Sequence, residues 1–124
     1  MEDNYGQSRP IAQLLRHRGY DVVPVYDGPS AIERAREYHP DLVLIDLLLV
    51  ERGDKLDGYD VISQLRGHPD TKEVGIIALS GHYIRGQDEI RALRLGADDF
   101  VRKETEFGVL EARIEAVLRR VHGS

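Results

Sequence analysis

The sequence contains no cysteine, which excludes a disulfide framework and a thiolate metal site. It also lacks the ~20 consecutive apolar residues that a membrane-spanning helix needs, because the longest apolar run, residues 42–50, is interrupted by Asp46. The first four residues are acidic or polar apart from Met1, unlike the start of a signal peptide. A basic surplus is missing too, and the formal net charge of −5 argues against a dedicated nucleic-acid binder. These absences predict a cytoplasmic protein that binds neither nucleic acid nor membrane.

The chain has 124 residues and shows no repeat, low-complexity run or linker, so we expect a single domain over residues 1–124. Short aliphatic runs alternate with amphipathic stretches. Strands are predicted at residues 21–26, 42–45, 74–79 and 100–101. The first should lie at a sheet edge, because Pro24 cannot donate a backbone hydrogen bond. This alternation predicts an α/β fold with a doubly wound parallel sheet.

Helices are predicted near and between these strands, from apolar residues that recur at helical spacing. We expect Gly19, His39-Pro40 and Gly96 to end three of them. The apolar residues that mark these helices are Ile11, Leu14 and Leu15; Ala31, Ile32, Ala35 and Tyr38; Val61, Ile62 and Leu65, which are predicted to face inward; Ile90, Leu93 and Leu95; and Leu110, Ile114, Val117 and Leu118.

Polar residues follow the predicted strands at the positions where such sheets bind ligands, beyond the carboxyl ends of the strands. They are Asp46, Ser80 and Lys103, while Glu2 and Asp3 precede the first predicted helix. Converging carboxylates repel one another, and a hard divalent cation such as Mg²⁺ relieves the repulsion. A lysine and a serine at the same place could hold phosphoryl oxygens. The pattern therefore favours Asp46 as a carboxylate that accepts a phosphoryl group.

Each of these residues also has an ordinary structural explanation. An aspartate after a strand often caps a helix or forms a turn, and Ser80-Gly81 is common loop chemistry. Lys103 could be a surface lysine, and terminal acidic residues are usually solvated. It is their joint occurrence at the ends of consecutive strands that favours the functional interpretation.

Four segments resemble the receiver domains of two-component response regulators. Residues 39–46 (HPDLVLID) are similar to the phosphoacceptor strand, and residues 56–62, with Asp57-Gly58, are similar to the segment that opens the third helix. Residues 76–81 (IIALSG) match the strand that ends in Ser or Thr, and residues 96–103 (GADDFVRK) match the segment that ends in lysine. The resemblance implies a flavodoxin-like sheet with strand order 2-1-3-4-5.

The resemblance also implies a role for each matching residue. Asp46 would take a phosphoryl group from a histidine kinase or phosphotransfer protein, Lys103 would pair with that group, and Ser80 would move toward it. Phe100 would be the aromatic that turns inward with Ser80, although plain core packing explains an aromatic there equally well. The implied Mg²⁺ ligands are Glu2 (through water), Asp3, Asp46 and the backbone carbonyl of Leu48.

The implied output surface consists of helix 87–95, strand 99–102 and helix 105–121, and its downstream partner is an unknown protein. A homodimer could form through this surface or through a gap at a strand edge. The domain is expected to catalyse its own phosphoryl transfer and slow dephosphorylation, and so to be a signalling domain rather than an enzyme. Since no output domain follows Val121, we expect it to act alone.

The sequence departs from the family pattern in four places. The strand that normally precedes the acidic pair is missing, which predicts unpaired strand edges, with low stability or strand-mediated dimerisation. The loop from Asp46 to Gly58 is longer than usual and carries extra acidic residues. Glu104 stands where the family has proline after a cis bond, so a trans bond should aim Lys103 less well. Pro10 predicts a late start of the first helix.

Two other kinds of function remain to be weighed. The same fold could serve as a pseudo-receiver, a protein-docking module that takes no phosphate. An aspartyl-nucleophile hydrolase is disfavoured because Leu48 stands where the general acid would be, and no G-x-G-x-x-G follows a strand for dinucleotide binding. Among the histidines, only His82 lies near the predicted site.

Overall fold

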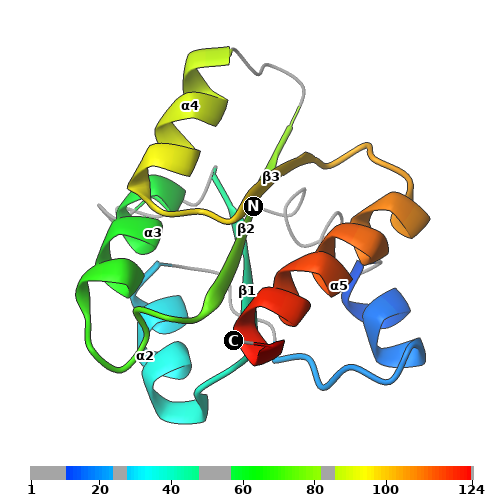
Figure 1. Cartoon of the computed structure of the whole chain (residues 1–124), viewed down its shortest axis with the longest axis horizontal. Helices are drawn as coiled ribbons and strands as arrows, with labels where there is room; N and C mark the ends of the chain where they lie inside the picture. Colours follow the sequence, from blue (N-terminus) through cyan, green and yellow to red (C-terminus); the bar gives the residue numbers. More distant parts are fainter. Residues whose placement is uncertain (1–10, 24–27, 48–56, 82–85, 124) are drawn as a thin grey trace.

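The computed structural model describes residues 11–23, 28–47, 57–81 and 86–123. Residues 11–17 are helical, and the later elements alternate along the chain (Figure 1). In chain order they are α2 (Gly28–Tyr38), β1 (Leu42–Asp46), α3 (Gly58–Gly67), β2 (Gly75–Ser80), α4 (Gly86–Leu95), β3 (Asp99–Arg102) and α5 (Phe107–Gly123). No helix in these residues is long and apolar enough to cross a membrane.

The three described strands form a parallel sheet in the order β1-β2-β3. The register sets Asp46 opposite Leu79 on β2, and Ser80 opposite Arg102 on β3. The carboxyl ends of the strands therefore meet at one edge. The predicted α/β class is confirmed, while the order 2-1-3-4-5 stays a prediction beyond these three strands.

Helices cover both faces of the sheet. Figure 1 shows α2, α3 and α4 on one side and α5 with helical residues 11–17 on the other. Ile76 and Ala78 of β2 belong to the core cluster under α2, α3 and α4, whereas Ile77 and Leu79 belong to the cluster under α5. Both faces of β2 are buried, which explains why its sequence is continuously apolar.

The helix boundaries follow local signals in the sequence. Asp57 caps α3: its Oδ1 accepts a hydrogen bond from the Asp60 amide at 2.9 Å, and Asp60 Oδ2 accepts one from the Asp57 amide at 3.2 Å. Gly96, with φ of 123°, follows α4 in a conformation that glycine adopts at little cost. The predicted ends at His39-Pro40 and Gly96 are confirmed.

Two expectations were wrong in part. Residues 21–23 form no strand; the Val22 carbonyl accepts a hydrogen bond from the Arg16 side chain instead of a strand partner, and the Val22 side chain packs against the cluster under α5. Residues 24–26 lie outside the described part. Several of the apolar residues from which the helices were predicted are exposed: Leu14 (40%), Tyr38 (54%), Ile90 (49%) and Leu93 (42%). The fully buried residue of α4 is the small Ala92, so this helix buries little apolar surface against the core.

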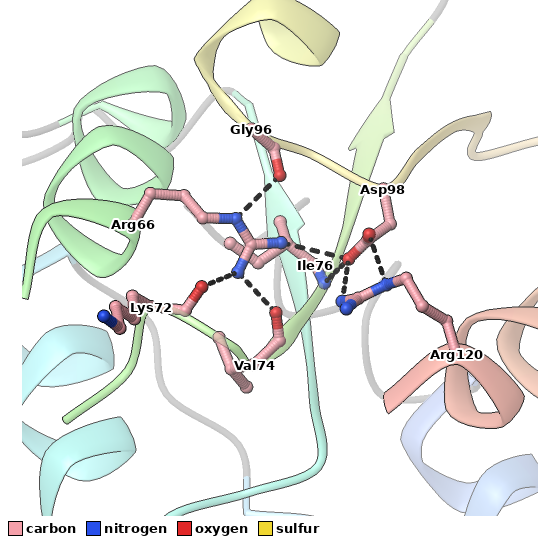
Figure 2. Close-up of polar contacts among 7 residues, drawn as sticks. All are labelled: Arg66, Lys72, Val74, Ile76, Gly96, Asp98 and Arg120. Atoms are coloured by element: carbon pink, nitrogen blue, oxygen red, sulfur yellow. Dashed lines mark hydrogen bonds and ion pairs between the residues drawn. The ribbon is translucent and has the colours of Figure 1, made fainter. Parts of the chain in front are cut away.

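Arg66, near the end of α3, connects this helix to two loops. Its guanidinium donates hydrogen bonds to the carbonyls of Gly96 (2.9 Å), Lys72 (3.0 Å) and Val74 (Figure 2). Burial lowers the pKa of Arg66 from its usual value, and the nearby Asp98 carboxylate opposes this shift. The side chain thus fixes the far end of α3 against the start of β2 and the end of α4.

Asp98 is the fourth hydrogen-bond partner of Arg66 and also contacts two further groups. Its Oδ2 accepts from Arg66 at 3.0 Å and from the Ile76 amide at 2.9 Å. Arg120 of α5 approaches the same carboxylate, with Nε 2.9 Å from Oδ1 (Figure 2). One carboxylate therefore links helices from opposite faces of the sheet at the amino end of β2.

We predict that Arg66→Ala lowers the free energy of unfolding by about 3 kcal/mol, because it leaves carbonyls and Asp98 without their half-buried partner. Urea unfolding followed by circular dichroism measures the change. Arg36→Ala is the control: Arg36 pairs with Asp70 across a half-exposed contact and should contribute less than about 0.5 kcal/mol. Equal losses in the two variants would contradict a structural role for the network.

Candidate functional site

Asp46 is the last residue of β1 and lies at the carboxyl edge of the sheet. Its Oδ2 is 2.6 Å from Nζ of Lys103, which follows β3. The side chains are 21% and 13% exposed, respectively, so the ion pair is largely shielded yet reachable from solvent. The structure thus joins two predicted site residues that are 57 positions apart in the chain.

The backbone of Lys103 is held by the neighbouring strand. Its amide donates a hydrogen bond to the Ser80 carbonyl at 2.7 Å, which extends the pairing of β2 and β3 by one step. The described residues contain no cis peptide bond, so the Lys103–Glu104 bond is trans as expected. The expectation that a trans bond would misdirect Lys103 was wrong, because its ammonium group reaches Asp46 directly.

Ser80 ends β2, the strand between β1, which carries Asp46, and β3, which Lys103 follows. Its side chain is half-buried, and the following Gly81 faces open space on the side where a Cβ would lie. The structure therefore brings Ser80 to the same edge as the ion pair.

Phe100 lies in β3 opposite Ala78 and packs against the core cluster under α2, α3 and α4. It is half-buried and therefore contributes to the core. Its predicted switch role stays a prediction.

The metal site can be assessed only in part. Glu2, Asp3 and Leu48 lie outside the described residues, as does His82, and Asp46 is the one implied Mg²⁺ ligand within them. Residues 11–23, 28–47, 57–81 and 86–123 contain no group of three potential metal-binding side chains. The implied donors are all oxygen atoms, which are the ligands that Mg²⁺ prefers.

Gly58, the first residue of α3, lies against the strand end that carries Asp46. A Cβ built on Gly58 would be 2.6 Å from the Asp46 carbonyl oxygen and 2.6 Å from the Leu47 Cα. The sequence identified the Asp57-Gly58 pair only as part of a family motif. It gave no sign of this contact, because a long loop separates the two segments.

Tyr59 connects the same end of α3 to α4. The Arg91 guanidinium lies over its ring, 4.0 Å from the centroid. Burial raises the pKa of Tyr59, and the negative charge of Asp88 raises it further. Sequence reasoning missed this contact, since an arginine and a tyrosine 32 positions apart carry no local signal.

Comparison with known proteins agrees with this geometry. The sequence matches the family described as "Response regulator receiver domain" over residues 1–115. It is 43% identical to the "Probable transcriptional regulator ycf27" of Porphyridium aerugineum, over 98% of this chain and 47% of that protein. It is 38% identical to the "Sensory transduction protein RegX3" of Mycolicibacterium smegmatis, over 97% of this chain and 49% of that protein. The chain spans about half the length of these curated relatives.

Solved structures give the same result. A putative response regulator from Chloroflexus aurantiacus superposes with a TM-score of 0.82 at 27% identity, covering 91% of this chain and 88% of that one. The BeF3-activated N-terminal receiver domain of Klebsiella pneumoniae RstA superposes with a TM-score of 0.77 at 33% identity, covering 88% and 86%. The chain therefore belongs to the family of response regulator receiver domains.

Proposed function

We propose that this chain accepts a phosphoryl group on Asp46 from a histidine kinase or phosphotransfer protein. The observation that carries the proposal is the 2.6 Å contact between Asp46 Oδ2 and Lys103 Nζ at the carboxyl edge of the sheet. The chain's family and its relatives in sensory transduction support the same conclusion.

In the proposed reaction an Asp46 carboxylate oxygen attacks the phosphorus in line with the leaving group. A new P–O bond forms, the P–N bond of the donor's phosphohistidine breaks, and the electron pair stays on the imidazole, which takes up a proton. Lys103 neutralises negative charge on the phosphoryl oxygens, and the Ser80 hydroxyl donates a hydrogen bond to one of them. This assignment makes positioning and charge the main sources of catalysis.

Mg²⁺ is part of the proposal, held by Asp3, Asp46, the Leu48 carbonyl and, through water, Glu2. When bound, the ion would neutralise further charge on the phosphoryl group. Its oxygen donors suit the chemistry, and the described ligand, Asp46, ends its strand at the edge where the other site residues gather.

The proposed output surface is the α4–β3–α5 side of the molecule. Ile90 and Leu93 of α4 are 49% and 42% exposed, and Val109 of α5 is 42% exposed. Large apolar side chains at this exposure are suited to contact with a downstream protein or a second copy of the chain. We further propose that the protein is cytoplasmic and is a signalling domain rather than an enzyme.

The first test is incubation with acetyl phosphate and Mg²⁺, followed by intact-protein mass spectrometry. We predict that the wild type gains the mass of one phosphoryl group and that Asp46→Asn gains none. Asp41→Asn is the matched control, because Asp41 immediately precedes the same strand but its side chain is 66% exposed. No gain on the wild type would contradict the proposal and favour the pseudo-receiver alternative; a gain that survives Asp46→Asn would place the acceptor elsewhere.

A second prediction concerns Lys103. Replacing it with glutamine removes one charged donor from the site and should slow phosphorylation by acetyl phosphate roughly 100-fold. Lys72→Gln is the control, since Lys72 is exposed near the amino end of β2, and it should react at the wild-type rate. Circular dichroism establishes that both variants are folded, and equal rates in folded Lys103→Gln and wild type would exclude the assigned role.

A further inference from the structure

The close contact of Gly58 with the strand end involves backbone atoms of the candidate site itself. The position of a Cβ on Gly58 lies 2.6 Å from the Asp46 carbonyl oxygen and from the Leu47 Cα, and 3.1 Å from a methyl group of Leu47. Real Cβ atoms essentially never approach closer than 3.0 Å, so any other residue would force these segments apart. Gly67, at the other end of α3, faces open space.

The helix that carries Gly58 is firmly fixed, so it cannot easily yield. Val61, Ile62 and Leu65 are fully buried, and the Asp57–Asp60 capping box holds the first turn. At the far end Arg66 is hydrogen-bonded to three carbonyls and to Asp98 (Figure 2). The end of β1 is held to β2 by the hydrogen bond from the Leu47 amide to the Leu79 carbonyl (3.0 Å), so an added methyl group on Gly58 would strain the contact between the two segments and shift the backbone of Asp46 and Leu47.

We infer that Gly58 is a positioning residue for phosphoryl transfer: its missing side chain lets α3 support the backbone of Asp46 and Leu47, and so sets the carboxylate against Lys103. This inference rests on the proposed function and assigns a role beyond it. Gly58 touches the backbone that carries the nucleophile, and it acts through Asp46 rather than on the phosphoryl group.

The position of the β1 end affects the alignment of Asp46 with Lys103 and with the phosphoryl donor. The Asp46–Lys103 contact of 2.6 Å spans two strands, so a shift of the β1 end changes that distance directly. In-line transfer depends on alignment of the reacting atoms, and a misplacement of ~1 Å can cost about 100-fold in rate. A Cβ added at Gly58 would have to move from 2.6 Å to at least 3.0 Å from these backbone atoms. This shift is smaller than ~1 Å, so we expect roughly a tenfold loss of the phosphorylation rate.

The test compares Gly58→Ala with Gly67→Ala, which adds the same methyl group to the same helix in open space. Phosphorylation by acetyl phosphate with Mg²⁺ is followed by mass spectrometry over a range of donor concentrations. We expect Gly58→Ala to lower the maximal rate roughly tenfold, while the half-saturating donor concentration and final stoichiometry stay unchanged. Gly67→Ala should match the wild type.

These readouts separate positioning from loss of folded protein. Partial unfolding lowers the rate only in proportion to the folded fraction, which circular dichroism measures. If the wild type is phosphorylated and Gly58→Ala reacts within twofold of it, the inference is overturned and the proposed function stands. If Gly58→Ala fails to fold, a measurement in the wild-type background decides. Lys103→Gln removes the ammonium group from Asp46 and should move the Gly58 amide resonance but not that of Gly67. An unmoved Gly58 resonance overturns the inference.

A phosphorylation-independent measurement covers the case in which the wild type accepts no phosphate and the proposed function fails. A double-mutant cycle with Asp46→Asn and Lys103→Gln gives the coupling of the pair from urea unfolding. The cycle is measured in the wild-type and Gly58→Ala backgrounds. A coupling that falls to less than half supports positioning by Gly58, whereas an unchanged coupling overturns it.

Discussion

Hydrogen bonding of β2 to a strand on each side is the constraint on which the rest of the structure depends. Asp46 ends β1 and Lys103 follows β3. The two side chains meet only because β2 fixes the register of both neighbouring strands. Residues Gly75 to Leu79 of β2 are buried, and slipping a neighbouring strand by one residue would exchange the side chains that it presents to the two core clusters. Core packing therefore sets the position of the ion pair, although neither charged residue belongs to the core.

The features that could be predicted from the sequence are those that depend on residues close together in the chain. Strands at residues 42–45, 74–79 and 100–101 were predicted nearly as they occur, because buried parallel strands are apolar on both faces. Asp46, Ser80 and Lys103 were predicted from their places after those strands. The stretch at residues 21–23 was misread because β propensity depends on context: Val22 packs in the cluster under α5, and its carbonyl accepts a hydrogen bond from the Arg16 side chain rather than from a neighbouring strand.

The features that the sequence did not reveal are contacts between distant segments. Helical spacing predicted an apolar stripe on α4, but only the packing of the helix in the structure shows that the small Ala92 is buried while Ile90 and Leu93 are exposed. Likewise, Arg66 and Asp98 are 32 positions apart, and nothing local marks either as a network residue. Gly58 belongs to the same class, since its need for a missing side chain arises from a backbone across the loop.

The neighbouring helices α3 and α4 differ in how many buried side chains hold them, and this difference bears on which of them a charge change at Asp46 could shift. α3 buries three large aliphatic side chains, each of which contributes ~2 kcal/mol. α4 buries Ala92, with Leu95 half-buried, and is tied to α3 by the Arg91–Tyr59 contact, an interaction of about 1 kcal/mol. A ligand shifts a conformational equilibrium only by its differential affinity for the two states. In the proposed reaction, a phosphoryl group on Asp46 would therefore need less differential affinity to shift α4 than to shift α3, and α3 would keep supporting Asp46.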